Sequence, residues 1–290
     1  MIYLMFFFGS FVGVLGNAFM KFFGRTVPDS GVGDGVYYAV NVPVALLYFG
    51  LMCGFDLRVN SVTLMFAAAF SVVCYLAVFF QLRAFRYASL VNVSIFSSAG
   101  TLVVTSLAGV ILFDEKISPK EMAGFLFTLI SVAVPYIVSK KDRPGMKGLL
   151  YCILFALNGV LVRVIMKLYY TVPEPMNENV FCFYTNVFLF PFVLMMKRKT
   201  FFEQGFFRET ITKYKKAVII AAAVVVCSNI STLISMVFLG KVDLFVSAVL
   251  APPITICFNF LFDIILFKEK IKVSNVLSTL CAVAAMLFMI

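Results

Sequence analysis

The stretch Phe113-Asp114-Glu115-Lys116-Ile117 recurs as Phe267-Lys268-Glu269-Lys270-Ile271, 154 positions further along the chain. Each copy comes directly after a long apolar run, at residues 87–112 and 241–266, and each is followed by another apolar run. The recurrence indicates an internal duplication of a hydrophobic unit. Many secondary transporters are built from two repeats of this kind.

The composition is that of an integral membrane protein. Hydrophobic residues make up 62% and charged residues 13% of the 290 positions, whereas a soluble domain carries about 25% charged residues. A run of about 20 apolar residues spans a bilayer, and runs that are apolar all round and this long favour helices over a β-barrel. We expect an all-α membrane protein with ten transmembrane helices: Ile2–Phe22, Val36–Gly54, Ser61–Leu82, Ser89–Leu112, Pro119–Val138, Gly148–Lys167, Val180–Met196, Lys216–Leu239, Leu244–Phe267 and Val273–Ile290.

Shorter matches extend the duplication to the first helix of each half. Gly13-Val14-Leu15 and Met20-Lys21 match Gly159-Val160-Leu161 and Met166-Lys167 at an offset of 146. The later offset of 154 implies about eight extra residues in the second half, which we assign to the basic segment 197–216. The predicted units are a first five-helix repeat at residues 1–142 and a second at 143–290, with 197–216 as a basic amphipathic loop between helices 7 and 8.

The odd number of spans in each unit has a mechanical consequence. Because each half has five spans, the second half enters the membrane in the opposite sense to the first, which makes the two halves an inverted repeat. Such halves can exchange conformations, so that one mouth closes as the other opens, around a substrate site near the membrane midplane.

Positive charge is unevenly shared between the two predicted sides of the membrane. One side holds every one of the 24 Lys and Arg residues except Arg58, Lys116, Lys120, Arg163, Lys167 and Lys241. Cytoplasmic loops carry the excess of positive charge, so both termini are predicted to face outward. We expect a multi-pass protein of a bacterial cytoplasmic membrane whose basic loop contacts membrane lipid, and no binding of nucleic acid.

The five-plus-five layout resembles the drug/metabolite transporter superfamily, and within it the ten-helix EamA-type permeases. Each half ends with a helix rich in small residues (from Tyr87-Ala88-Ser89 and from Val242-Asp243-Leu244), the F-x-E-K-I turn and a closing helix. The family commonly has a proline midway along helices 4 and 9. Pro252-Pro253 matches this in the ninth helix, whereas the fourth reads Ser97-Ser98-Ala99-Gly100. The resemblance implies a permease for small metabolites, in a family whose termini are often cytoplasmic.

The first candidate site residues are Pro252 and its counterpart at the 154 offset, Ser98. Two consecutive prolines remove two backbone N–H groups from the middle of a span and should loosen the helix there. Interruptions at matching positions in both halves point to the central site of a transporter. The alternative is a kink that improves helix packing.

Polar amides within the apolar runs form a second group. Such groups must face the bundle interior or a cavity, because an unsatisfied amide in lipid is costly. They either contact a polar substrate or hydrogen-bond one helix to another. The residues are Asn17, Asn92, Asn158, Asn229 and Asn259.

Charged and aromatic residues complete the candidates. Arg163, with Lys167 one turn later, suits a carboxylate or phosphate group, because intramembrane charge is usually functional; snorkelling of Lys167 to the interface is the alternative. Asp263 is a candidate for proton coupling, for binding a cation or for pairing with Arg163. The alternative is an ordinary carboxylate that is solvated near the membrane surface. Tyr75 and Phe79 are expected to line a cavity for an amphipathic or cationic solute, unless they only pack against other helices.

Several patterns of catalytic and cofactor-binding proteins are absent from the sequence. There is no histidine, no Walker A motif and no paired aspartate cluster, so we expect no enzyme activity, no metal and no cofactor. The seven cysteines lie in or beside apolar runs and are expected to stay reduced. Glu115 and Glu269 are interpreted as structural, capping their turns and pairing with Lys116 and Lys270.

The sequence therefore predicts a secondary transporter that moves a small organic metabolite or drug-like solute by alternating access. Its site is expected at the interface of the two repeats, and a proton or a sodium ion is the candidate coupling ion. A passive channel or facilitator and a non-transporting membrane partner subunit are the alternatives that the residues leave open.

Overall fold

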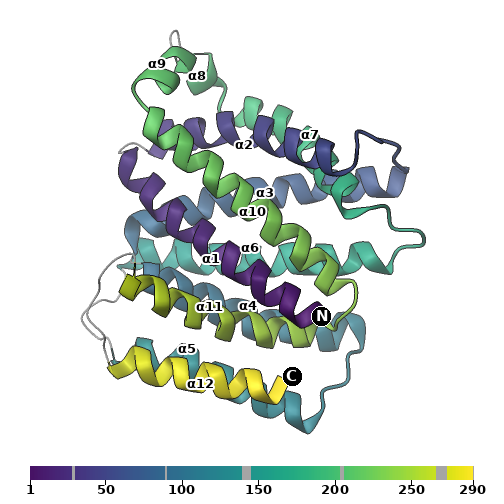
Figure 1. The fold of residues 1–290 in the computed structure, drawn as a ribbon, viewed down its shortest axis with the longest axis vertical. Coiled ribbons are helices and arrows are strands. Elements are labelled where there is room, and N and C mark those ends of the chain that lie inside the picture. The colour runs from purple at the N-terminus through teal and green to yellow at the C-terminus, as the bar shows by residue number, and fades with distance from the viewer. Residues whose placement is uncertain (28–29, 89, 139–144, 203–205, 266–272, 290) are drawn as a thin grey trace.

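The computed structural model describes residues 1–27, 30–88, 90–138, 145–202, 206–265 and 273–289, and these residues form helices and connecting turns without a strand. Figure 1 shows the helices side by side, with the N- and C-termini on the same side of the molecule, at the right-hand ends of α1 and α12. They are α1 (Ile2–Thr26), α2 (Ser30–Met52), α3 (Ser61–Tyr87), α4 (Leu90–Phe113), α5 (Pro119–Val138), α6 (Met146–Thr171), α7 (Glu178–Met196), α8 (Arg198–Phe201), α9 (Phe206–Thr212), α10 (Lys215–Leu239), α11 (Leu244–Ile265) and α12 (Val273–Met289).

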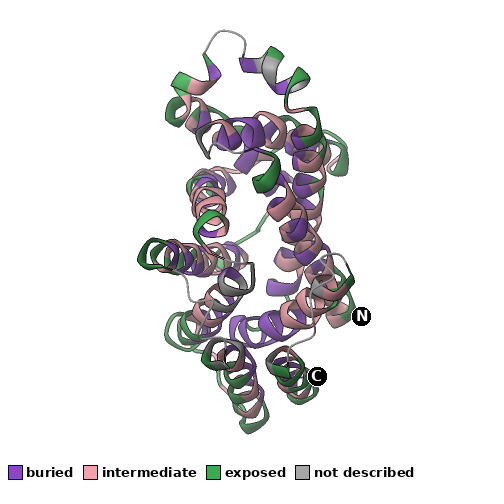
Figure 2. Cartoon of the chain, turned by 90° about the vertical axis from the view of Figure 1, so that its left-hand side faces the viewer, coloured by how far each residue is buried: buried purple, intermediate pink, exposed green. Residues whose placement is uncertain are grey.

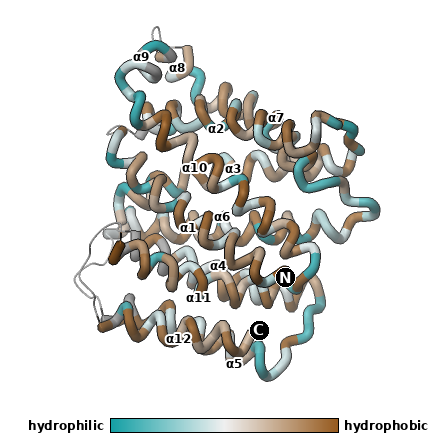
Figure 3. The backbone as a smooth tube through the Cα atoms, in the orientation of Figure 1, coloured by the Kyte–Doolittle hydropathy of each residue, from teal (hydrophilic) through white to brown (hydrophobic). Residues whose placement is uncertain are grey.

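Eight helices are long and apolar enough, within the described residues, to cross a membrane: α1, α2, α3, α4, α6, α7, α10 and α11. α12 has a shorter apolar stretch, Asn275–Met289. Large apolar side chains such as Leu47, Ile111 and Leu280 are exposed on the outer faces, and the apolar colouring of Figure 3 runs along the helices while polar residues gather at their ends. Apolar outer faces of this kind contact lipid. The chain is therefore an all-α, multi-pass membrane protein.

The long helices pack in a pairwise pattern that connects the two halves of the chain. α1 packs along α10 and α3 along α6, while α5 and α12 form a pair at one end of the long axis. α4 contacts both α6 and α11, and α2 contacts both α7 and α10. Figure 2 shows buried residues on the inward faces of these helices and exposed residues on the outer faces.

The largest core cluster joins α1, α2, α3, α6, α7 and α10 and is rich in aromatic rings. Tyr75 stacks on Tyr38 with ring centroids 5.3 Å apart and meets Phe192 edge-on at 5.0 Å. The Tyr38 hydroxyl also donates to the Tyr75 carbonyl at 2.9 Å. Aromatic pairs add to the stabilisation that burial alone provides, so these rings hold α2, α3 and α7 together.

Small residues allow close helix crossings. A Cβ on Gly100 of α4 would lie 2.6 Å from the Ala156 Cβ of α6. Glycine and alanine at such contacts let two backbones approach, which is how many membrane helices associate.

The first F-x-E-K-I turn connects the two halves of the chain. The two carboxylate oxygens of Glu115 accept the backbone N–H groups of Leu244 and Phe245, the first residues of α11. Glu115 therefore caps a helix of the other half and not its own turn, and among the described residues it forms no ion pair with Lys116. The second copy of the motif, at residues 267–271, lies outside the described residues.

α11 continues through Pro252-Pro253 as one helix, so the loosening expected from two prolines does not break it. Pro253 supplies no N–H to the carbonyl of Val249 four residues earlier. The Thr128 hydroxyl of α5 lies 3.3 Å from that carbonyl oxygen and 2.9 Å from the Gly124 carbonyl oxygen. A side chain from a neighbouring helix thus helps to satisfy the freed carbonyl.

A buried ion cluster joins the start of α2 to the ends of α3 and α7. Asp34 is 1% exposed, and its Oδ2 lies 2.5 Å from Lys197 Nζ and 3.6 Å from Arg83 Nη1. The Arg83 guanidinium also lies 3.4 Å from the centre of the Phe79 ring. No local pattern in the sequence predicts this cluster, because Asp34 and Lys197 are 163 positions apart.

The basic segment after α7 contains α8 and α9, which contact α2, α7 and α10. Phe201 and Phe206 pack against each other, with ring centroids 5.4 Å apart, and both are buried in the main core cluster. Phe202 is 73% exposed. These three phenylalanines therefore divide between the protein core and the surface. All seven cysteines are free thiols.

Candidate functional site

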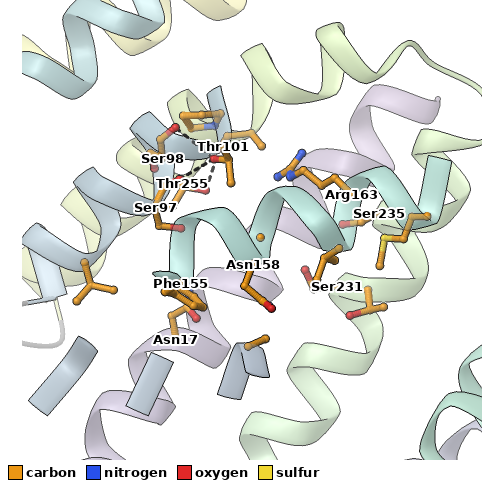
Figure 4. A pocket seen from close by; sticks show the side chains of 18 of the residues that line it. Asn17, Ser97, Ser98, Thr101, Phe155, Asn158, Arg163, Ser231, Ser235 and Thr255 are labelled. Carbon is orange, nitrogen blue, oxygen red and sulfur yellow. Dashed lines mark hydrogen bonds between the residues drawn. The ribbon is translucent and has the colours of Figure 1, made fainter. Parts of the chain in front are cut away.

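A cavity of about 320 Å³ lies between α1, α3, α4, α6, α10 and α11. Figure 4 shows side chains from these helices converging on it, with Asn158 and Arg163 on α6. A second cavity of about 270 Å³ adjoins the first and shares Asn17, Arg163 and Thr255 with it. A third, of about 250 Å³, lies toward α2 and α7. Thr232 of α10 borders all three cavities, so together they form one polar region in the centre of the bundle.

Arg163 is the charged residue of the region and borders the first two cavities. Its Nη1 donates to the Ser247 hydroxyl at 2.9 Å and lies 3.4 Å from the Ser247 carbonyl oxygen. Within the described residues Ser247 is its hydrogen-bond partner, and no carboxylate lies within 4.0 Å of it. Arginine stays charged in proteins, so the cavity carries a positive charge without a counter-ion from the described part of the chain.

Lys167 has a different role from Arg163, although both lie on α6 one turn apart. Its Nζ donates to the carbonyl oxygens of Leu239 at 3.2 Å and Val242 at 2.8 Å. These carbonyls belong to the end of α10 and the turn that follows it, where a lysine satisfies groups that the helix leaves unpaired. Lys167 borders none of the three cavities, so the expected two-cation site consists of Arg163 alone.

Three of the expected asparagines lie at the cavities. Asn17 accepts a hydrogen bond from Gln81 Nε2 at 2.9 Å. Asn158 donates to the Val73 carbonyl at 3.1 Å, while its buried Oδ1 has no partner among the described residues. Asn229 borders the third cavity, and its buried Nδ2 also has no partner there. Asn17 and Asn158 thus hydrogen-bond one helix to another beside a cavity, whereas Asn229 borders a cavity without such a bond among the described residues. Contact of these asparagines with a substrate stays a prediction.

Ser98 and Pro252 both border the 320 Å³ cavity, from α4 and α11 respectively. Two threonines beside them make the same local bond in each half. Thr101 donates to the Ser97 carbonyl at 2.7 Å, and Thr255 donates to the Ala251 carbonyl at 2.9 Å. The two positions differ by 154, and because α4 and α11 pack against each other, their threonines form adjoining parts of the wall (Figure 4).

Hydroxyl groups of α10 form a part of the site that the sequence analysis missed. They follow the spacing i, i+3, i+4 and i+7, which places them on one face of a helix. Hydroxyl residues at this spacing within an apolar run are the sequence signal by which this face of the helix could have been found. The residues are Ser228, Ser231, Thr232 and Ser235, which border the second cavity.

Other expected site residues lie elsewhere or outside the described part. Tyr75 and Phe79 belong to the aromatic core and border none of the three cavities, and neither does Asn259. The side chains of Asn92 and Asp263 lie outside the described residues. The backbone of Asp263 is 16 residues beyond Ser247 in α11, about 24 Å along a helix axis, which is too far for pairing with Arg163.

The fold and the cavity define the class as an all-α, multi-pass membrane protein with a polar centre. No protein-family model matches the chain, and no curated protein matches it. The chain is similar to a solved structure described only as "Crystal structure of protein", with a TM-score of 0.66 over 98% of this chain and 95% of that one. The sequence identity is 15%, so this likeness concerns the fold alone.

Proposed function

We propose that the protein is a secondary transporter that moves a small organic solute across the membrane by alternating access. The ten long helices then form two inverted repeats, as in EamA-type permeases of the drug/metabolite transporter superfamily, and both termini face outward from a bacterial cytoplasmic membrane. The solute binds in the central cavity between the repeats.

Helix packing supports the repeat. If α1, α2, α3, α4 and α5 correspond to α6, α7, α10, α11 and α12, the α1–α10 contact corresponds to the α6–α3 contact. The α4–α6 contact likewise corresponds to α11–α1, and all four contacts are present. The bounds of the helices agree with an offset of 146 up to α7 and of 154 from α10 onward. The additional elements are then α8 and α9, between α7 and α10.

The observation that carries the proposal is the pairing of equivalent positions around one cavity. Asn17 and Arg163 are 146 positions apart, while Ser98 and Pro252, like Thr101 and Thr255, are 154 apart. All six border the 320 Å³ cavity. A site built from equivalent positions of two halves is what alternating access requires, because exchanging the conformations of the halves moves the opening from one side of the site to the other.

The size of the cavity agrees with a small solute. Ligand pockets in proteins occupy about 300–1,000 Å³, and a volume of about 320 Å³ is at the small end of that range. Hydroxyl and amide groups among apolar neighbours give such a cavity the few polar contacts that orient a ligand.

Flux into proteoliposomes tests the proposal. A panel of small metabolites is offered with and without imposed proton and sodium gradients, and empty liposomes serve as the control. A carrier gives saturable uptake of one solute class, and the gradients identify a coupling ion. Uptake that rises linearly with concentration and ignores both gradients would instead indicate a channel, and absence of flux for every solute would favour a partner subunit.

A further inference from the structure

We infer that the solute bears an anionic group, a carboxylate or a phosphate, which binds the guanidinium of Arg163. This inference rests on the proposed transport function and adds the chemical class of the substrate. It begins from the charge of Arg163 and from the absence, within the described residues, of a carboxylate that could balance it.

Arg163 is partly buried, and withdrawing an unbalanced charge from water is unfavourable, because the membrane interior and the protein replace water only in part. Arg163 keeps its charge at all accessible pH values. The free-energy cost of holding this charge away from water therefore persists until an anion from outside the chain binds. A ligand that supplies the missing negative charge gains an interaction that a neutral ligand of equal size lacks.

The residues that border the three cavities reinforce this preference. They include no Asp or Glu, so no described carboxylate competes with the solute for Arg163 or attracts a cation. The Asn17 carbonyl oxygen already accepts from Gln81, which leaves its amide N–H groups as donors on the cavity wall. Hydroxyls of Ser231 and Ser235 are further donors. The polar groups beside Arg163 thus suit acceptor oxygens.

The guanidinium has one edge available for such oxygens. Nη1 is engaged by Ser247, and within the described residues the Nε and Nη2 groups have no partner. These two groups form the parallel pair of N–H donors that carboxylates and phosphates bind in bidentate fashion. Figure 4 shows the guanidinium above α6, on the side of the cavity formed by Thr101. A bound anion would therefore lie between α4, α6 and α11.

The arrangement also limits the solute to one anionic centre. The position equivalent to Arg163 in the first half is Asn17, and Lys167 is held by the carbonyl oxygens of Leu239 and Val242. A single cation in a cavity of about 320 Å³ fits a compact head with one anionic group and a short polar or apolar remainder.

Thermal unfolding of the purified full-length protein tests the inference with matched probes. Butanoate and butyl phosphate are compared with butanamide, butan-1-ol and butan-1-amine, and each set is repeated with chains of three and six carbons. Inorganic sulfate serves as the smallest anion. We expect the anions to raise the Tm saturably and the neutral and cationic members to leave it unchanged, because a ligand that binds only the folded state stabilises it.

Variants locate the effect. Arg163→Gln should raise the anion concentration for the half-maximal shift at least about tenfold, since it removes a charge-assisted bidentate contact. Lys167→Gln, a cation lost one turn away on the same helix, should leave that concentration unchanged. Arg163→Lys retains the charge without the planar fork and should weaken binding less; it replaces the glutamine variant if the latter does not fold.

Neutral or cationic members that act as well as the anions would overturn the inference, as would an Arg163→Gln variant with unaltered anion binding or a wild-type protein that no anion stabilises. The outcome is separable from that of the proposed function. Saturable flux of a neutral solute refutes the anion and retains the carrier. Anion binding that depends on Arg163 without any flux refutes the carrier and retains the anion site.

Discussion

The carboxylate of Glu115 binds the start of a helix 129 residues further along the chain: Oε1 lies 2.6 Å from the Leu244 nitrogen and Oε2 lies 2.7 Å from the Phe245 nitrogen. Helix N-termini have unpaired N–H groups and a partial positive charge, so an anion is stabilising there. The F-x-E-K-I turn thereby fastens the end of α4 to the beginning of α11. These are the two helices that contribute Ser98 and Pro252 to the cavity.

Replacing Glu115 by alanine should lower the stability by about 1–2 kcal/mol, because two N–H groups of α11 lose their acceptor and the helix dipole loses its anion. Glu115→Gln should lose less, since its amide oxygen can still accept one N–H. Thermal unfolding in detergent measures both. Asp56→Asn, a change in the exposed loop between α2 and α3, is the control; a Glu115→Ala protein as stable as this control would contradict the cap.

Neutralising Asp34 should be more damaging than removing either of its partners. Asp34→Asn leaves Lys197 and Arg83 partly buried without their counter-charge, and breaking a buried pair costs about 3 kcal/mol. Lys197→Met should cost less, because Arg83 remains near the carboxylate. Chemical unfolding of the three proteins checks this order, and equal stability of Asp34→Asn and the wild type would refute it.

A methyl group at Gly100 should push α4 away from α6. Its Cβ would lie 2.6 Å from the Ala156 Cβ, which cannot move without its backbone, and overpacking of this kind costs about 1–3 kcal/mol. Gly24→Ala is the matched control, because a Cβ there meets nothing within 4 Å and alanine favours the helix. The two substitutions should change the Tm in opposite directions. A Gly100→Ala protein that gains stability like the control would show that α4 and α6 do not approach this closely at Gly100.

Asn17→Asp should weaken anion binding while leaving Arg163 in place. Asn17 and Arg163 border the same two cavities, so the new carboxylate supplies from the protein the charge that the solute is expected to supply. The concentration of anion for half-maximal thermal stabilisation should rise about tenfold, and Asn17→Ser, which adds no charge, should have a smaller effect. Equal effects of the two variants would show that the charge at position 17 does not determine the affinity for the anion.

Hydrophobic length predicts the positions of the helices well, and its errors have identifiable causes. The third span was expected to end at Leu82, but α3 continues to Tyr87. The extra turn carries Arg83, whose charge is balanced by Asp34 and whose guanidinium lies over Phe79. A hydropathy pattern treats Arg83 as the end of a span, because its counter-ion Asp34 comes from another helix.

Candidate site residues divide in the same way. Asn17, Arg163, Ser98 and Pro252 could be selected from the sequence, because each is unusual within an apolar run and the offsets relate them in pairs. Tyr75 has no such signature, since an aromatic residue in a span is equally suited to a cavity wall and to a packed core. Its position is decided by Tyr38 of α2 and Phe192 of α7. No local sequence pattern predicts that these two helices lie next to α3.

Counterflow tests most directly whether the protein is an alternating-access carrier whose solute site includes Arg163. Proteoliposomes loaded with the unlabelled solute that the flux panel identifies are diluted into a trace of the same solute with a radioactive label, in parallel for the wild type, Arg163→Gln and Lys167→Gln. An alternating-access carrier with its site at Arg163 should give a transient accumulation of label above equilibrium in the wild type and Lys167→Gln, and strongly reduced accumulation in Arg163→Gln. Uptake that approaches equilibrium without an overshoot, at a rate independent of the internal solute, would contradict the account.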